Sequence, residues 1–348
     1  MQRGSLIAAV TACLATTASA VSPAAPTRID PLFAADQGET RAALLIVGGK
    51  VEAKRYASGY SDATRFISWS MAKTLTAALV GELVADGKLS LDAPAPIAEW
   101  RKPGDPRGAI TLRHLLQMAS GLRHLEVSEP IEASDTNQVL FVGGTHDMAA
   151  RAIAAPLVAR PGSVFNYSSL TTIILSEIVT RTLTDSRDPR VRAAAYRDFA
   201  NERLFLPAEI TSAVLDFDGA GTQVGGSIVY MTLDDWGRFG TLLLDGGTAI
   251  APEWLAFMKA PSPANPEYGG QTWLNRRGGG GSDGPTLFPE RGPATLVSAN
   301  GHLGQRVFAS PDSAGGRGAV LVRLGNTPDS KNRRVRDSMA GVIAALDR

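Results

Sequence analysis

The segment from Ser70 to Asp86 constrains the fold of this 348-residue chain more than any other feature. Its pattern predicts a helix that ends before Gly87, a residue typical of the position just after a helix. Apolar residues cover almost its whole circumference: Met71, Leu75, Ala78, Leu79, Val80, Leu83 and Val84. Because a helix that is apolar all round must be covered on every side, we expect it at the centre of the protein, between two layers.

The segments around this helix predict strands near both chain ends and helices between them. Two apolar segments flank Gly48-Gly49-Lys50 and predict a β-hairpin, residues 42–47 and 51–59. Helical periodicity occurs in five further segments: 110–118 with Thr111 as N-cap, 147–157, 170–182, 233–244 and 335–346. The later strand candidates are 305–309 and 319–324. This order predicts an α+β fold with a helical insert. The glycine-rich stretch 276–284 predicts a surface loop and lacks the Gly-Lys-Ser/Thr of a phosphate-binding loop.

Composition narrows the classes of function. The chain is 44% hydrophobic, and its 35 Lys and Arg nearly balance its 34 Asp and Glu. Such a balance gives no electrostatic footprint for nucleic acid, so no nucleic-acid partner is expected. One cysteine and four histidines without a His-Glu-x-x-His pair argue against a zinc hydrolase.

The first twenty residues predict a secretory signal peptide. Arg3 precedes a short apolar run, and Ala18-Ser19-Ala20 has the small residues of a cleavage site, so we expect cleavage after Ala20 and a periplasmic or secreted protein. A lipoprotein anchored through Cys13 is the second reading of this segment. Residues 21–40 form a predicted lead-in to the fold, of which Val21–Pro31, with its three prolines, is expected to be flexible. No later apolar run approaches the ~20 residues of a membrane span, so no integral membrane segment is expected.

Ser70 and Lys73 have the Ser-x-x-Lys spacing, which places both side chains on one face of the predicted helix. A lysine with a lowered pKa can take the proton of a serine hydroxyl and make it a nucleophile. The alternative is a capping serine beside a solvated lysine. Because an idle charge on the most apolar helix would be costly, we favour the catalytic interpretation.

Two other segments carry residues suited to the same chemistry. Tyr167 precedes the predicted helix 170–182, where it could share a proton with a lysine, although a buried structural tyrosine is the commoner case. Gly301-His302-Leu303-Gly304-Gln305 opens a strand candidate, where a backbone N–H could complete an oxyanion hole, although a lone histidine is more often structural.

Five segments, in this order along the chain, carry a resemblance to a known family: Phe66–Thr74, Ile110–Leu122, Phe165–Ser169, Gly225–Gly240 and Gly301–Gln305. They resemble the penicillin-recognising serine hydrolases, in their class C β-lactamase-like branch, and the resemblance spans about residues 40–330. Trp69-Ser70-Met71-Ala72-Lys73 and Ser134-Asp135 are most similar to the 6-aminohexanoate-dimer hydrolases, and the family VIII-type esterases belong to the same branch.

The resemblance implies a β-lactamase/DD-peptidase-like fold, an antiparallel sheet flanked by helices with an inserted all-helical domain. It implies an α/β domain of residues 41–75 and 222–348, a mainly helical domain of residues 76–221, and a catalytic cleft between them. Ser70 would be the nucleophile, Lys73 the general base and Tyr167 the proton relay. The backbone N–H groups of Ser70 and Gln305 would form the oxyanion hole, and the substrate pocket would contain Ser169, His302 and Gly304.

The function that the resemblance implies is a serine hydrolase that cleaves a small amide or ester through an acyl-enzyme, without a metal or organic cofactor. The predicted signal peptide adds the expectation that this hydrolase is exported. The chain departs from class C β-lactamases at two places. Ser169 replaces their Asn, and His302-Leu303-Gly304 replaces Lys-Thr-Gly, whose lysine would bind the carboxylate of a β-lactam. A slow-turnover penicillin- or peptidoglycan-binding protein and a weak class C-type β-lactamase remain the alternatives. The sequence leaves the natural substrate and the oligomeric state open.

Overall fold

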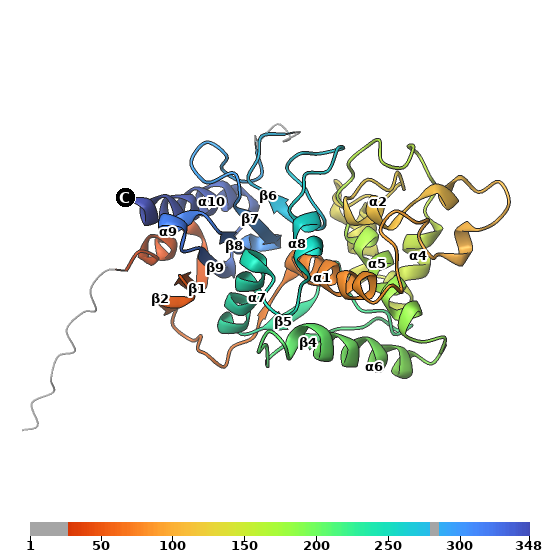
Figure 1. Ribbon diagram of the computed structural model, residues 1–348, viewed down its shortest axis with the longest axis horizontal. Coiled ribbons are helices and arrows are strands. Elements are labelled where there is room, and N and C mark those ends of the chain that lie inside the picture. Colours follow the sequence, from red (N-terminus) through yellow and green to blue (C-terminus); the bar gives the residue numbers. More distant parts are fainter. Residues whose placement is uncertain (1–26, 279–284) are drawn as a thin grey trace, which may run out of the picture.

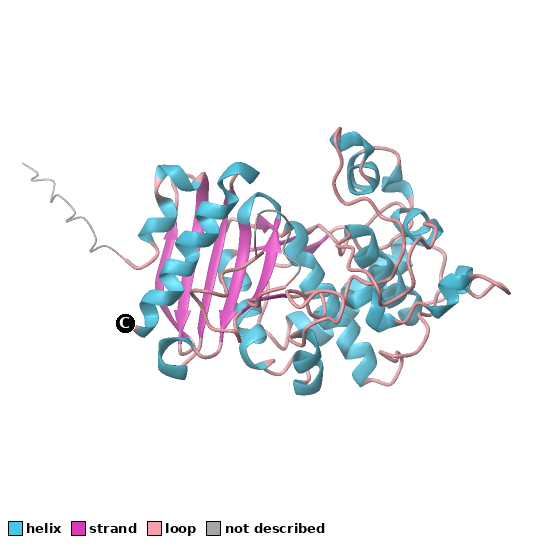
Figure 2. Cartoon of the chain, turned by 90° about the horizontal axis from the view of Figure 1, so that it is seen from above, coloured by secondary structure: helices cyan, strands magenta, loops and turns pink. Residues whose placement is uncertain are grey.

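The computed structural model describes residues 27–278 and 285–348. The predicted signal peptide, Cys13, the first part of the lead-in and most of the glycines of the 276–284 loop lie outside these residues. The described part combines a six-stranded antiparallel sheet with a large group of helices, which lie side by side in Figure 2. The predicted α+β class is confirmed.

The sheet has the strand order β2-β1-β9-β8-β7-β6, so strands from both chain ends meet in its middle. The strands are β1 (Glu39–Val47), β2 (Lys50–Tyr56), β6 (Trp273–Leu274), β7 (Val297–Gly301), β8 (Gln305–Ser310) and β9 (Ala319–Asn326). The expected hairpin is present. Gly48 and Gly49 have φ values of 55° and 75°, and two such residues in a row make the tight turn whose twist matches its strands.

Helices cover both faces of this sheet because side chains alternate across each strand. Leu45, Leu321 and Phe308 are aligned across β1, β9 and β8 and pack with α10 (Asp329–Ala344). The neighbouring row packs with α7 (Leu233–Asp245) on the opposite face (Figure 1). A Cβ on Gly240 of α7 would lie 2.4 Å from Val320, so the glycine allows the helix to approach the sheet closely.

The remaining elements form the helical part and a small second sheet. That sheet has the order β3-β5-β4, with β3 (Phe66–Ile67), β4 (Val214–Leu215) and β5 (Val229–Met231). The helices are α1 (Ala72–Ala85), α2 (Leu112–Leu116), α3 (Asp135–Phe141), α4 (Met148–Ala154), α5 (Ser169–Leu183), α6 (Pro189–Ala200) and α8 (Pro252–Met258). The short α9 (Ser313–Gly316) belongs instead to the sheet side, where it connects β8 to β9 beside α10.

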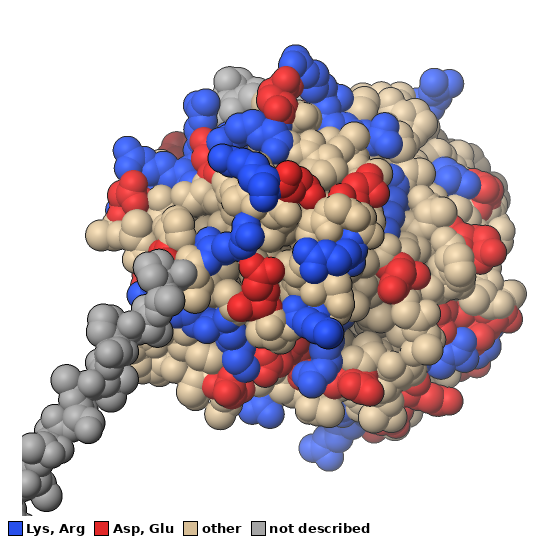
Figure 3. Space-filling view, turned by 60° about the vertical axis from the view of Figure 1, so that its left-hand side comes forward, with Lys and Arg blue, Asp and Glu red and all other residues tan. Residues whose placement is uncertain are grey.

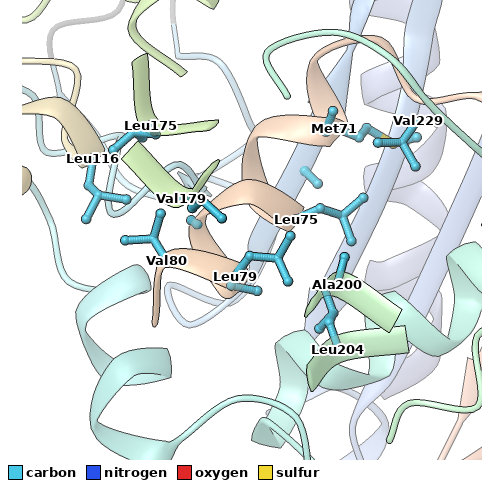
Figure 4. Packing of buried hydrophobic residues seen from close by; sticks show 14 of the residues in the cluster. Met71, Leu75, Leu79, Val80, Leu116, Leu175, Val179, Ala200, Leu204 and Val229 are labelled. Atoms are coloured by element: carbon cyan, nitrogen blue, oxygen red, sulfur yellow. The ribbon is translucent and has the colours of Figure 1, made fainter. Parts of the chain in front are cut away.

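Helix α1 lies at the centre of the molecule, as its apolar surface predicts. Figure 4 shows Leu75, Leu79 and Val80 of α1 in a packed cluster with side chains from other helices and from β5: Leu116, Leu175, Val179, Ala200, Leu204 and Val229. Eleven of its fourteen residues are buried, Lys73 among them. Helix α8 lies especially close, since a Cβ on Gly81 would be only 2.3 Å from the Trp254 ring.

Three predictions of local structure need correction. Helix α2 spans only Leu112–Leu116, although Thr111 caps it as expected. Helix α10 begins at Asp329, six residues before the predicted start, because its first turn is polar and carries no apolar periodicity. The described end of the lead-in is folded rather than flexible: Asp30–Phe33 and Ala35–Gln37 form 3-10 turns, and Ile29 and Leu32 are buried in the cluster under α10.

The distribution of charge on the surface and the apolar length of the helices complete the description of the fold. On the face shown in Figure 3, acidic and basic side chains are interspersed without a patch of one sign. Across the described residues, no helix is long and apolar enough to span a bilayer.

Candidate active site

Ser70 lies in a tight turn between β3 and α1. The 3-10 turn Trp69–Met71 precedes α1 and contains Ser70. The sequence predicts Ser70 in the first turn of the α-helix, so this prediction is wrong by one turn. Ser68 anchors this turn, since its hydroxyl donates to the Ser227 carbonyl and accepts from the Val229 N–H. Trp69 has a φ of 43°, which is unusual for a residue with a side chain and points to a conformation that the surroundings impose.

Lys73 is fully buried directly beneath this serine. Its Nζ lies 2.9 Å from Ser70 Oγ, 2.8 Å from Ser169 Oγ and 2.6 Å from the Gly226 carbonyl oxygen. Burial lowers the pKa of Lys73 from 10.5 to about 8, although the negative charge of Glu126 opposes this effect. A substantial fraction of the amine is therefore unprotonated near pH 8, as a general base requires.

Glu126 is a site residue that the sequence analysis missed. Its carboxylate accepts hydrogen bonds from the Ser169 N–H at 2.6 Å, the Ser169 hydroxyl at 2.7 Å and the Thr136 hydroxyl at 2.6 Å. Glu126 follows the Ile110–Leu122 segment in a stretch without helix or strand, 43 residues before Ser169. No local pattern links residues at such a distance, so only the fold could reveal the contact.

The Glu126 carboxylate sets the direction of the hydrogen bonds around Lys73. Because Ser169 donates its only hydroxyl hydrogen to Glu126, its oxygen accepts from Lys73. The Gly226 carbonyl can also only accept. Both N–H groups of an unprotonated Lys73 are thereby engaged, and its lone pair is left for the Ser70 hydroxyl.

The ring of Tyr167 also lies beside the buried Lys73. Its ring centre is 4.9 Å from Lys73 Nζ, and it packs against Tyr268 and Trp273 at centroid distances of 5.9 and 5.5 Å. Burial, and secondarily the charge of Glu126, raises the pKa of Tyr167 above its ordinary value, while hydrogen bonding with Ser70 acts against this. Tyr167 is therefore a neutral phenol at physiological pH, suited to passing a proton on rather than to acting as the first base.

The residues of the segment Gly301–Gln305 do not all lie at the pocket, because some of them pack within the sheet. His302 lies at the pocket, and its ring meets Trp69 edge-on at 5.5 Å. Gly304 does not line this pocket: with a φ of 78°, it packs against the buried guanidinium of Arg323. The Gln305 side chain bonds to the backbone of Gly325 on β9, so it stabilises the sheet. The oxyanion role of the Gln305 N–H stays a prediction.

A pocket of about 320 Å³ opens at Ser70. Its lining combines Ser70 and Ser169 with His302 and Asp329 from the sheet side, and with a segment of the helical part that includes Glu126 and Phe141. Residues from both predicted domains thus meet at the nucleophile, although the domain boundaries themselves stay a prediction. Within the described ranges, no three His, Cys, Asp or Glu side chains gather into a metal site.

Comparisons with known proteins agree with this geometry. The beta-lactamase family model matches residues 29–346. The chain is 24% identical over 338 residues to the 6-aminohexanoate-dimer hydrolase of Paenarthrobacter ureafaciens, covering 89% of this chain and 78% of that one.

Two solved structures show the same fold. A candidate 6-aminohexanoate-dimer hydrolase from Bacillus anthracis has a TM-score of 0.70 at 22% identity, covering 93% of this chain and 82% of that one. EstCE1, described as a hydrolase with promiscuous acyltransferase activity, has a TM-score of 0.64 at 18% identity, covering 91% and 97%. The chain belongs to the beta-lactamase family of serine hydrolases.

Proposed function

We propose that the protein hydrolyses a small amide or ester through a covalent acyl-enzyme on Ser70. The observation that carries the proposal is the position of Lys73: a buried amine with a pKa near 8, 2.9 Å from a serine hydroxyl that opens onto a pocket. A structural lysine would be expected to pair with an adjacent carboxylate. In this structure the Glu126 carboxylate is hydrogen-bonded to Ser169 and not to Lys73, and Ser169 is in turn hydrogen-bonded to the amine. The amine lies against the Ser70 hydroxyl.

The chemistry follows from the hydrogen bonds around Lys73. The unprotonated amine accepts the Ser70 proton as Oγ attacks the substrate carbonyl, and the resulting ammonium is held by Ser169, Gly226 and the charge of Glu126. Tyr167 then relays a proton to the leaving nitrogen or oxygen. The N–H groups of Ser70 and Gln305 are our candidates for stabilising the oxyanion. Water finally releases the acyl group.

We propose the substrate class from the names of the related proteins. The dimer hydrolase of Paenarthrobacter ureafaciens is named for the dimer of 6-aminohexanoate, so this dimer is the first amide to test. Short acyl esters are the second class, because an activated serine attacks esters more readily than amides.

Steady-state hydrolysis tests this proposal. Protein lacking residues 1–20 and its Ser70→Ala variant would be assayed on p-nitrophenyl esters, 6-aminohexanoate dimer and a chromogenic cephalosporin. We expect ester or amide turnover that Ser70→Ala abolishes while the circular dichroism spectrum is unchanged. Turnover that persists in the variant would refute the nucleophile. Labelling of Ser70 by a fluorescent penicillin without any turnover would instead favour the slow-turnover binding protein.

We also propose that the protein is exported, on the basis of its first twenty residues. Expression of the full chain in a Gram-negative host should give a periplasmic product that begins at Val21. A cytoplasmic product that retains Met1 would refute export, and acylated Cys13 would favour the lipoprotein reading.

A further inference from the structure

The pocket beside Ser70 has an unbalanced charge. Two carboxylates line it, Glu126 and Asp329, whereas no Lys or Arg is among its described lining residues. Much of the remaining wall is apolar: Trp69, Val127, Ile131, Leu140 and Phe141. The lysine beneath the floor is only 1% exposed and already bonded to three oxygens, so it is not accessible to a charged group of a ligand.

Asp329 is the carboxylate in this pocket that is free to act on a ligand. Glu126 is committed to Ser169 and Thr136. Asp329, in contrast, has a side chain that is 78% exposed, and one of its oxygens accepts only from Asn332 at 2.9 Å. Its nearest basic group in the described structure is His302, whose Nδ1 lies 4.0 Å from the carboxylate.

The position of Tyr167 indicates which part of a substrate enters this pocket. Ser169 lines the pocket, whereas Tyr167 does not and packs instead with Tyr268 and Trp273. If Tyr167 passes the proton to the leaving group, the leaving group lies on the Tyr167 side. The acyl group then remains in the pocket, against the apolar wall to which Trp69 and Phe141 belong. This step rests on the proposed function.

From these contacts we infer that the enzyme selects aliphatic acyl groups whose far end is uncharged or cationic, and that it rejects acyl groups ending in a carboxylate. The apolar wall desolvates the chain, while Asp329 at the rim attracts a cation and repels an anion. The negative charge of Glu126 adds to both effects. Asp329 is thus a specificity-determining residue rather than a catalytic one.

Three p-nitrophenyl esters of similar length test the inference: heptanoate, 6-(trimethylammonio)hexanoate and the monoester of adipate. The quaternary ammonium carries a fixed charge and cannot attack its own ester. We expect kcat/KM for the ammonium ester to exceed that for the adipate ester by about tenfold or more at low salt, with heptanoate between them. High salt should reduce this ratio, because the rim is exposed.

The Asp329→Asn variant assigns the effect to one residue. We expect it to lower the ammonium-to-adipate ratio by about fivefold, the effect of an exposed charge pair worth about 1 kcal/mol. Glu253→Gln is the matched control, since Glu253 is an exposed acid in the first turn of α8 that does not line the pocket. Its ratio should equal that of the wild type.

The outcomes separate this inference from the proposed function. Equal kcat/KM values for the ammonium and adipate esters would overturn the inference, as would a ratio that Asp329→Asn leaves unchanged. If Ser70→Ala abolishes heptanoate hydrolysis in the same experiment, the proposed function stands whatever the charge preference. If heptanoate hydrolysis persists in Ser70→Ala, the proposed function is refuted, and the inference that rests on it is refuted with it.

Discussion

Replacing Lys73 with methionine should change how stability depends on pH. Burial holds the pKa of the native lysine at about 8, against 10.5 for an ordinary lysine such as that of the unfolded chain. Between these two pH values the unfolded chain binds more protons than the native protein, so the free energy of unfolding rises with pH. Below pH 8 both states are protonated and the destabilisation is constant. The full rise corresponds to about 3 kcal/mol.

Urea unfolding of the wild type and of Lys73→Met across this pH range measures the effect. We expect the wild type to gain about 3 kcal/mol relative to the variant between about pH 7 and 11. Lys50→Met is the matched control, because Lys50 is exposed at the start of β2, and its curve should run parallel to the wild type. Parallel curves for wild type and Lys73→Met would refute the claim that burial lowers the pKa of this lysine.

Three further substitutions test other parts of the account. Glu126→Gln should move the rising limb of the pH–rate profile to lower pH, because it removes the negative charge that raises the pKa of Lys73. It should also lower kcat by about tenfold, and a rising limb at the wild-type pH would contradict the role of Glu126. Tyr167→Phe should slow amide hydrolysis by about a hundredfold but p-nitrophenyl ester hydrolysis much less, since nitrophenolate leaves without a proton; equal losses would argue against the relay. Gly81→Ala should destabilise the protein by about 1–3 kcal/mol in urea unfolding because its Cβ would meet Trp254, whereas Gly341→Ala in the open surface of α10 should be neutral or stabilising.

The sequence predicts the elements whose signals are local. The apolar circumference of α1 predicts its central position, and Gly48-Gly49 predicts the hairpin. The Ser-x-x-Lys spacing predicts the contact between Ser70 and Lys73, since three residues of helical chain fix their separation. Ser169 was also expected at this site, and its hydroxyl lies 2.8 Å from Lys73 Nζ.

Features that depend on distant parts of the chain could not be predicted in this way. Strand β7 has the mixed sequence Val-Ser-Ala-Asn-Gly, whose place in the sheet is set by β8 beside it. Glu126 acts through Ser169, a contact that exists only once α5 is packed. Asp329 lines the pocket as the first residue of α10, six residues before the helix start that the apolar pattern indicates.

Labelling with an alkyl fluorophosphonate tests the central claim most directly, that Lys73 activates Ser70 as a nucleophile. The reagent phosphonylates activated serines, and intact mass with peptide mapping locates the adduct. We predict a single adduct on Ser70, formed at a rate that rises with pH through a midpoint near about 8, the pKa of the buried lysine. The adduct should be absent from Ser70→Ala and greatly slowed in Lys73→Met. An adduct at another serine, or a rate on Ser70 that Lys73→Met leaves unchanged, would contradict the account.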